Sequence, residues 1–116
     1  MSAADDRELA ELIFEHLCDE QPEAVAELRD AEILRRIHLG IERARSHELD
    51  GNGPITAFVT LMFLVAPNFD QHPRIRQALA DTSRDPEERM RRLFERTAEA
   101  DWDEAAAQAG AWEDLR

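Results

Sequence analysis

The stretch from Ile55 to Ala66 limits what this chain can fold into more than any other part of it. Ten of its twelve residues are apolar, and only Thr56 and Thr60 interrupt it. It follows Pro54, which suits the first turn of a helix, and precedes Pro67, which disfavours helical backbone at Ala66. A helix that spans a bilayer needs about 20 apolar residues, so this one is too short. Because a helix that is apolar on nearly all sides is normally surrounded by protein, we predict that residues 55–66 form the centre of the core.

Apolar residues elsewhere recur at the three- and four-residue spacing of an amphipathic helix. The clearest stripes are Leu9, Leu12, Ile13 and Leu17; Ile33, Leu34, Ile37, Ile41 and Ala44; and Met90, Leu93, Phe94 and Thr97. No segment alternates apolar and polar residues as a half-buried strand does. We therefore predict an all-α fold, a compact array of about six helices around the central apolar helix 55–66.

Local signals indicate where several helices begin. Asp30 and Asp85 precede periodic segments and suit helix caps, Asp85 by accepting a hydrogen bond from the backbone of Glu88. Asp101 repeats this signal before a final helix, and Phe69, between two prolines, is expected to fill the core. With 116 residues and no linker or repeat, the chain is predicted to be a single helical domain over residues 1–116. Its first part, 1–20, is an acidic helix, and its last, 111–116, is a tail that frays.

The chain is strongly acidic, with a formal net charge of −12. It would repel phosphate backbones and anionic lipids, so we expect no nucleic-acid and no membrane partner. Residues 1–32 hold eleven carboxylates against Arg7 and Arg29, a local balance of −9, and the rest of the chain accounts for −3. A protein with a basic patch is therefore expected to dock on this first part, although an acidic surface also serves solubility.

The basic residues and the cysteine indicate the setting. All fourteen basic side chains are arginine, which is typical of a GC-rich bacterial genome. Cys18 is the single cysteine, so no intramolecular disulfide forms, and we expect it to be a core or boundary thiol. The first six residues lack the basic and apolar regions of a signal peptide. Together these features favour a cytoplasmic location.

Motifs for catalysis and for metal or cofactor binding do not emerge from the sequence. The four histidines do not recur at the spacing that places two metal ligands on one helix face. The segment from Asp50 starts like a calcium loop, but its twelfth position is Leu61 in place of glutamate. No glycine-rich phosphate loop occurs. We therefore predict no catalytic residue, no metal and no cofactor.

Three segments resemble a family of small uncharacterised bacterial proteins. They are residues 40–47 (Gly-Ile-Glu-Arg-Ala-Arg-Ser-His), residues 58–70 (Phe-Val-Thr-Leu-Met-Phe-Leu-Val-Ala-Pro-Asn-Phe-Asp) and residues 89–102. Members of this family often lie among type VI secretion genes, near spike-tip and effector-adaptor proteins. The resemblance covers roughly residues 30–105, outside the acidic first helix. It implies a shared helical fold and carries no known active site.

These observations predict a non-enzymatic protein that binds another protein: an adaptor, a chaperone or an immunity protein for a secreted bacterial effector. The resemblance implies that this effector belongs to type VI secretion. An immunity protein commonly blocks a basic active site with carboxylates. The residues predicted to bind the partner are Asp5, Asp6, Glu8, Glu11, Glu15, Asp19, Glu20 and Trp112. For Trp112 the alternative is equally good, namely that it docks the last segment onto the core.

Two other interpretations stay open. A homodimeric scaffolding or regulatory domain would use the apolar surplus of the helix 55–66 as a shared core. An unrecognised enzyme would use the loop Asn68–His72, in which Asp70 and His72 are close in sequence. Asp70 is more simply explained as a turn or cap residue, and His72 as a loop cap.

Overall fold

The structure, a computed structural model, describes residues 3–115, with side chains described for residues 6–115. Within these residues every regular element is helical, which confirms the predicted all-α fold. The elements are α1 (Ala3–Glu20), α2 (Pro22–Val25), α3 (Asp30–Ser46), α4 (Asn52–Leu64), the short 3-10 helix η1 (Phe69–Gln71), α5 (Pro73–Leu79), α6 (Pro86–Arg96), α7 (Glu99–Ala107) and the short 3-10 helix η2 (Trp112–Asp114). No helix in this part of the chain combines the length and the apolar character needed to cross a membrane.

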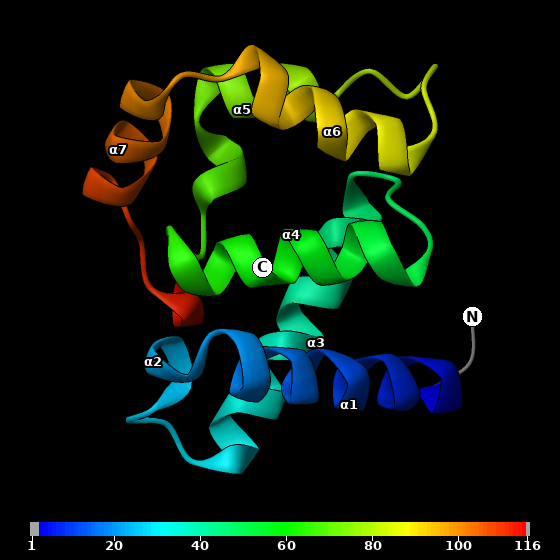
Figure 1. Ribbon diagram of the computed structural model, residues 1–116, viewed down its shortest axis with the longest axis vertical. Helices are drawn as coiled ribbons and strands as arrows, with labels where there is room; N and C mark the ends of the chain where they lie inside the picture. Colours follow the sequence, from blue (N-terminus) through cyan, green and yellow to red (C-terminus); the bar gives the residue numbers. More distant parts are fainter. Residues whose placement is uncertain (1–2, 116) are drawn as a thin grey trace.

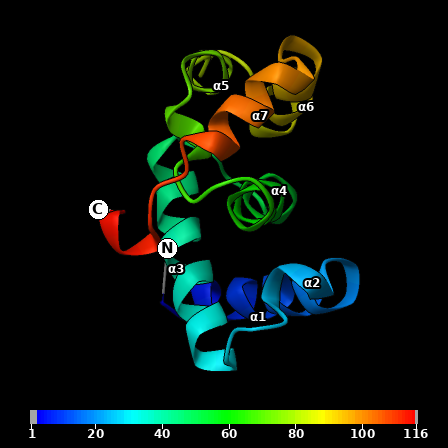
Figure 2. The same cartoon turned by 90° about the vertical axis from the view of Figure 1, so that its left-hand side faces the viewer.

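Helix α4 runs through the middle of the molecule, between α1 on one side and α6 on the other (Figure 1). The three helices run roughly side by side in that view, while α3 passes behind α4. Figure 2 shows α4 nearly end-on, with α1 and α2 below it, α6 above it and α3 along its inner side. Helix α4 therefore has neighbours on three sides, and its fourth side faces outward.

The core forms around α4, as the sequence predicts. Phe58, Val59 and Met62 are buried on its inner side. Phe69 is also buried and packs against Phe58 with ring centroids 4.9 Å apart, which confirms its predicted place in the core. Helix α3 approaches α4 closely at Gly40, where an added Cβ would lie 2.9 Å from Val59 Cγ2. A small residue is thus needed where these two helices cross.

Three large apolar side chains assigned to the core by the helical period are instead about half exposed. The accessible fractions are 52% for Leu12, 48% for Leu64 and 53% for Phe94. The prediction was wrong here because periodicity identifies the apolar side of a helix without showing whether a neighbour covers it. On α1, Ala10 and Ile13 lie at the centre of the buried side and leave Leu12 at its edge. On α4 and α6, no helix in the described part of the chain lies over the outward side chains.

The helix starts agree with prediction in one case and differ in two. Asp85 accepts the hydrogen bond from Glu88 N–H at 2.8 Å, as predicted. The N-cap of α3 is Arg29 and not Asp30, which is already helical. Helix α7 begins at Glu99, ahead of the predicted Asp101, because the Asp101 carboxylate accepts the Ala98 N–H at 2.8 Å from within the first turn.

The C-terminal segment that was expected to fray is packed as far as Leu115. Trp112 is only 8% accessible, and its ring lies 4.9 Å from that of Phe63 on α4. The Arg36 guanidinium of α3 lies 5.3 Å from the same ring. Aromatic and cation–π contacts thus hold η2 against both helices. Cys18, in contrast, is exposed, so its assignment as a core or boundary thiol was wrong.

Candidate protein-binding surface

Most of the carboxylates predicted to bind a partner lie exposed on α1. They are Glu8, Glu11, Glu15, Asp19 and Glu20. Helix α1 is amphipathic: Leu9, Ile13 and Leu17 bury one side, which turns the charged residues toward solvent. In the described part of the chain, none of these five carboxylates forms an ion pair. Their negative charge is therefore available to a partner.

The other predicted binding residues are placed differently. The Asp6 carboxylate is paired with Arg45 of α3, so its charge is compensated. The side chain of Asp5 lies outside the described residues. Trp112 is buried against α3 and α4 and offers little surface to a partner. Glu32, although part of the acidic segment 1–32, is hydrogen-bonded by Arg35 and Arg36, and these bonds lower its pKa to about 2.

An apolar groove lies beside α1. Its volume is about 630 Å³, and it is lined mainly by α4, with His16 of α1 and Phe94 of α6 at its two sides. Leu61 and Leu64 of α4 are among the apolar residues that line it. The Thr60 hydroxyl donates to the Thr56 backbone oxygen at 2.7 Å, so it presents no unsatisfied polar group. Contiguous apolar surface of this kind marks interaction sites on folded proteins.

Helical spacing on α1 brings the acidic residues to the edge of this groove. Leu12 and Asp19 lie four residues before and three residues after His16, so the three side chains share one face of the helix. Glu15 is adjacent to His16. Glu8 lies one turn before Leu12, and both line a neighbouring hollow of about 300 Å³ between α1 and the start of α4. An apolar surface on α4 and an acidic wall on α1 therefore adjoin each other.

A third hollow, of about 470 Å³, is polar and lies between the end of α3 and η1. Both oxygens of the buried Asp70 carboxylate accept from Arg43 Nε, at 2.9 and 2.8 Å, and His47 Nε2 lies 2.6 Å from one of them. Asp70 is therefore a buried ion-pair partner, and its prediction as a turn or cap residue was wrong. The cluster ties η1 to α3.

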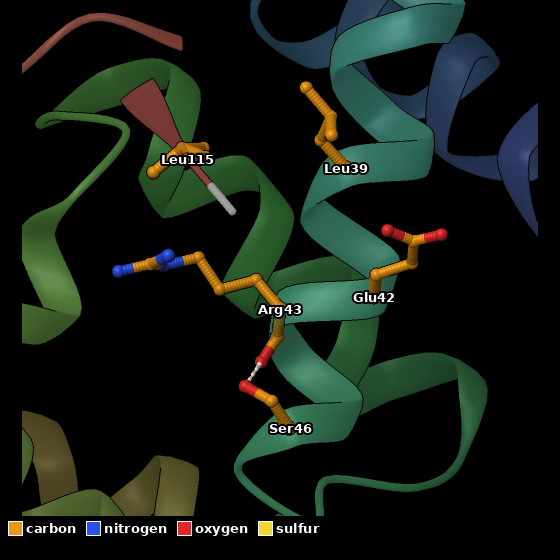
Figure 3. Close-up of a pocket in the computed structure, with 5 residues that line it drawn as sticks. All are labelled: Leu39, Glu42, Arg43, Ser46 and Leu115. Atoms are coloured by element: carbon orange, nitrogen blue, oxygen red, sulfur yellow. Dashed lines mark hydrogen bonds between the residues drawn. The ribbon is translucent and has the colours of Figure 1, made fainter. Parts of the chain in front are cut away.

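The serine beside this cluster is not arranged as a nucleophile. Ser46 Oγ donates to the Arg43 backbone oxygen at 2.6 Å, the bond drawn in Figure 3, and not to His47. A nucleophilic serine needs a base within hydrogen-bond reach of its hydroxyl. The hollow in Figure 3, between α3 and Leu115, measures about 140 Å³. Small-molecule sites are typically about 300 Å³ or larger, so this one is too small.

His72, Asp101 and Glu104 bring three potential metal ligands within 4.8 Å of one another. Their hydrogen bonds argue against a metal site. His72 Nδ1 accepts the Arg74 backbone N–H at 3.3 Å and so caps the start of α5, which leaves only Nε2 for another contact. That Nε2 faces Glu104 at 3.3 Å, and Arg74 Nε lies 3.5 Å from Asp101. The group is a hydrogen-bonded contact between α5 and α7.

A buried arginine positions α6, the helix that carries Phe94. Arg89 is 2% accessible and donates to the backbone oxygens of His47 at 2.7 Å, Glu48 at 2.6 Å and Leu79 at 3.1 Å. Sequence reasoning missed this residue. The available signal was its spacing of four residues before the buried Leu93, which places it on the inner side of α6.

Sequence reasoning also missed Leu64 and Phe94 as surface residues. The available signal was that the segment 55–66 is apolar on more sides than a few short helices can cover. Comparison of the chain with protein-family models, with curated proteins and with solved structures found no match.

Proposed function

We propose that this protein is a non-enzymatic accessory factor that binds another protein, as an adaptor, chaperone or immunity protein for a secreted bacterial effector. The observation that carries the proposal is the set of exposed carboxylates on α1, above all Glu8, Glu15 and Asp19, next to the apolar groove of α4. Apolar surface supplies buried area in an interface, and a charged wall orients the partner. The resemblance to proteins found near type VI secretion genes supports an effector as that partner.

Electrostatics determines which partners suit this surface. The net charge of −12 favours approach of a basic protein surface and slows approach of an acidic one. Because exposed charges are screened by salt, the association rate should fall as ionic strength rises. A partner with a basic patch, such as the active site of an enzyme that acts on anionic substrates, fits these requirements.

The polar clusters elsewhere support a binding role over a catalytic one. Asp70 and His72, the pair on which an enzyme would depend, are bonded to different partners, Arg43 and Glu104, and not to each other. Each side chain links two helical elements of the fold. Such groups lack the mutual geometry of an acid–base pair.

The test is charge reversal on α1. A variant with Glu8, Glu11, Glu15 and Asp19 changed to lysine alters the net charge by +8, since each change adds two units. We expect a stoichiometric partner captured from the native lysate at low salt by the unaltered protein to be lost with this variant. Affinity for that partner, once purified, should fall by at least an order of magnitude, because several charge contacts are reversed together.

A matched control separates this local effect from net charge. Glu27, Glu42, Asp103 and Asp114 are exposed on other elements, and their reversal to lysine also adds +8. The control should keep its partner. Equal binding by both variants and the unaltered chain at low salt, or the absence of any stoichiometric partner, would contradict the proposal.

A homodimeric scaffold is the second candidate, and the exposed apolar side of α4 favours it. Leu61, Leu64 and Phe94 would form a shared core if two copies met across their grooves. Each copy would bring a net charge of −12 to that interface, which opposes association at low salt.

A further inference from the structure

The apolar groove has the length and the walls to take one helix. The residues of α4 in the groove, from Gly53 through Ala57 and Leu61 to Leu64, recur every three or four residues and form one strip. Between Gly53 and Leu64 the helix rises by about 17 Å, or about three turns. Helices α1 and α6 lie on either side of this strip (Figures 1 and 2). A partner helix laid between them would pack on α4 as helices pack in a bundle.

Other occupants fit this groove less well. A peptide that binds by strand addition needs the open edge of a β-sheet, and the described part of the chain contains no strand. A fatty acid would place its carboxylate beside the acidic wall on α1, where like charges repel. A second copy of the chain would bring its own net charge of −12.

The two walls of the groove, α1 and α6, carry different charges. This difference determines which side chains are favoured on a partner helix. On the α1 side, Glu8, Glu15 and Asp19 are exposed without ion pairs among the described side chains. On the α6 side, the exposed Glu87 and Arg91 lie seven and three residues before Phe94, on its face of the helix, so that wall carries both signs of charge. Lysine or arginine on the partner is therefore favoured on the α1 side.

The anchor residues at the rim are already held in place. Phe94 stacks against Trp102 with centroids 5.8 Å apart and an interplanar angle of 21°. The Trp102 indole donates in turn to Thr97 Oγ1 at 3.0 Å. An aromatic side chain fixed in this way loses little freedom on binding, which favours its use as an anchor.

We propose, resting on the protein-binding function above, that the groove of α4 binds an amphipathic basic helix of the partner. Its apolar side lies on Leu61, Leu64 and Phe94, and its basic side faces α1. This is the helix-in-groove mode of recognition, in which apolar residues of the bound helix at positions i, i+3 or i+4, and i+7 contact the groove.

The probe is a labelled synthetic peptide of leucine, alanine and lysine, about 14 residues long and so about four helical turns. Leucines occupy one side of its helix and lysines the adjoining side. Two control peptides carry the same residues in scrambled order, and glutamate in place of lysine. We expect the amphipathic basic peptide to bind with a Kd in the micromolar range and both controls to bind at least about tenfold more weakly. Equal binding of all three peptides, or no binding of the first, would overturn the proposal.

Substitutions in the protein test whether the peptide binds in the groove. Leu64→Ser and Phe94→Ser, combined, should weaken peptide binding at least about tenfold. Leu39→Ser changes a leucine of α3 that lies outside the groove, and should leave peptide binding unchanged. Because both groove residues are half exposed, the double variant should fold, and circular dichroism with thermal unfolding checks this. An equal loss with Leu39→Ser would place the peptide elsewhere and overturn the assignment to the groove.

The native partner distinguishes failure of this inference from failure of the proposed function. If the α1 charge reversal abolishes partner binding but the Leu64 and Phe94 variant retains it, the function stands and the groove is not the docking site. If neither change affects the partner, both are wrong. If each of the two changes abolishes partner binding, and the basic peptide binds, the proposed function and the groove assignment are both supported.

Discussion

At the scale of single residues, Asp70 shows how a polar group in a loop stabilises the fold. Its side chain is 3% accessible, and its oxygens are held by Arg43 on α3 and by His47, the residue that follows α3. Removing the charge from one member of a buried pair leaves the other uncompensated in a medium where water cannot solvate it. The loop that enters α5 is therefore attached to α3 by an electrostatic contact, and to α4 by the packing of Phe69 on Phe58.

We predict that Asp70→Asn lowers the free energy of unfolding by about 3 kcal/mol, the lower end of the cost of breaking a buried ion pair. Urea unfolding followed by circular dichroism measures this. Glu42→Gln, which neutralises an exposed carboxylate on α3, is the control and should change the stability by less than about 0.5 kcal/mol. Similar effects of the two substitutions would show that the Asp70 contacts contribute nothing beyond net charge.

The partners of Asp70 could not be read from local sequence. Asp70 and His72 are two residues apart, yet η1 and the start of α5 direct them to α3 and to α7 respectively. Arg43 near the end of α3 and His47 just after it, four residues apart, did indicate two neighbouring basic groups that an acid could pair with. Which acid supplies it depends on how the loop after α4 folds back, and that is a tertiary property.

At the scale of helices, the crossing of α3 and α4 depends on one glycine. A Cβ added at Gly40 would lie 2.9 Å from Val59 Cγ2 and 3.2 Å from Met62 Sδ, closer than side chains tolerate. The helices would have to move apart, and the side chains of the core would lose contacts with each other. This crossing also sets the distance between α3 and α4, and so the position of the side of α4 that lines the groove.

We expect Gly40→Ala to destabilise the protein by about 1–3 kcal/mol, the usual cost of overpacking, although alanine is the better helix former by about 1 kcal/mol. Gly53→Ala, in the first turn of α4 where no atom lies within 4 Å of the added Cβ, should be neutral or stabilising. Thermal unfolding of the two variants gives the comparison. A stabilised Gly40→Ala would mean that the helices do not approach closely here.

Most helices could be predicted from the sequence because apolar spacing and proline position are local. The exposure of Leu64 on α4 and Phe94 on α6 could not be predicted, because the sequence pattern is the same whether or not a neighbour covers an apolar side chain. The packed tail was missed for a similar reason. Trp112 is held by Phe63 and Arg36, which are remote in the sequence.

At the scale of the whole molecule, shape and charge together determine how the protein associates. The Cα radius of gyration is 13.5 Å, close to the value of about 13 Å expected for a compact domain of this length. The acidic face of α1 and the groove lie on the same side of this body. An apolar surface bordered by one sign of charge attracts a complementary partner and disfavours self-association.

We therefore predict that the purified protein is a monomer at low salt, where repulsion between chains of net charge −12 is least screened. Sedimentation equilibrium and small-angle X-ray scattering over a range of concentrations measure the mass and the radius of gyration. If weak dimers form at high salt, Leu64→Ser should abolish them, because the apolar side of α4 is the surface that screening would release. A dimer that persists at low salt and survives Leu64→Ser would show that copies associate through another surface, and the groove would then remain open to a partner in the dimer as well. A low-salt dimer that Leu64→Ser dissociates would instead assign the groove to the homodimeric scaffold, in which the acidic face of α1 serves solubility.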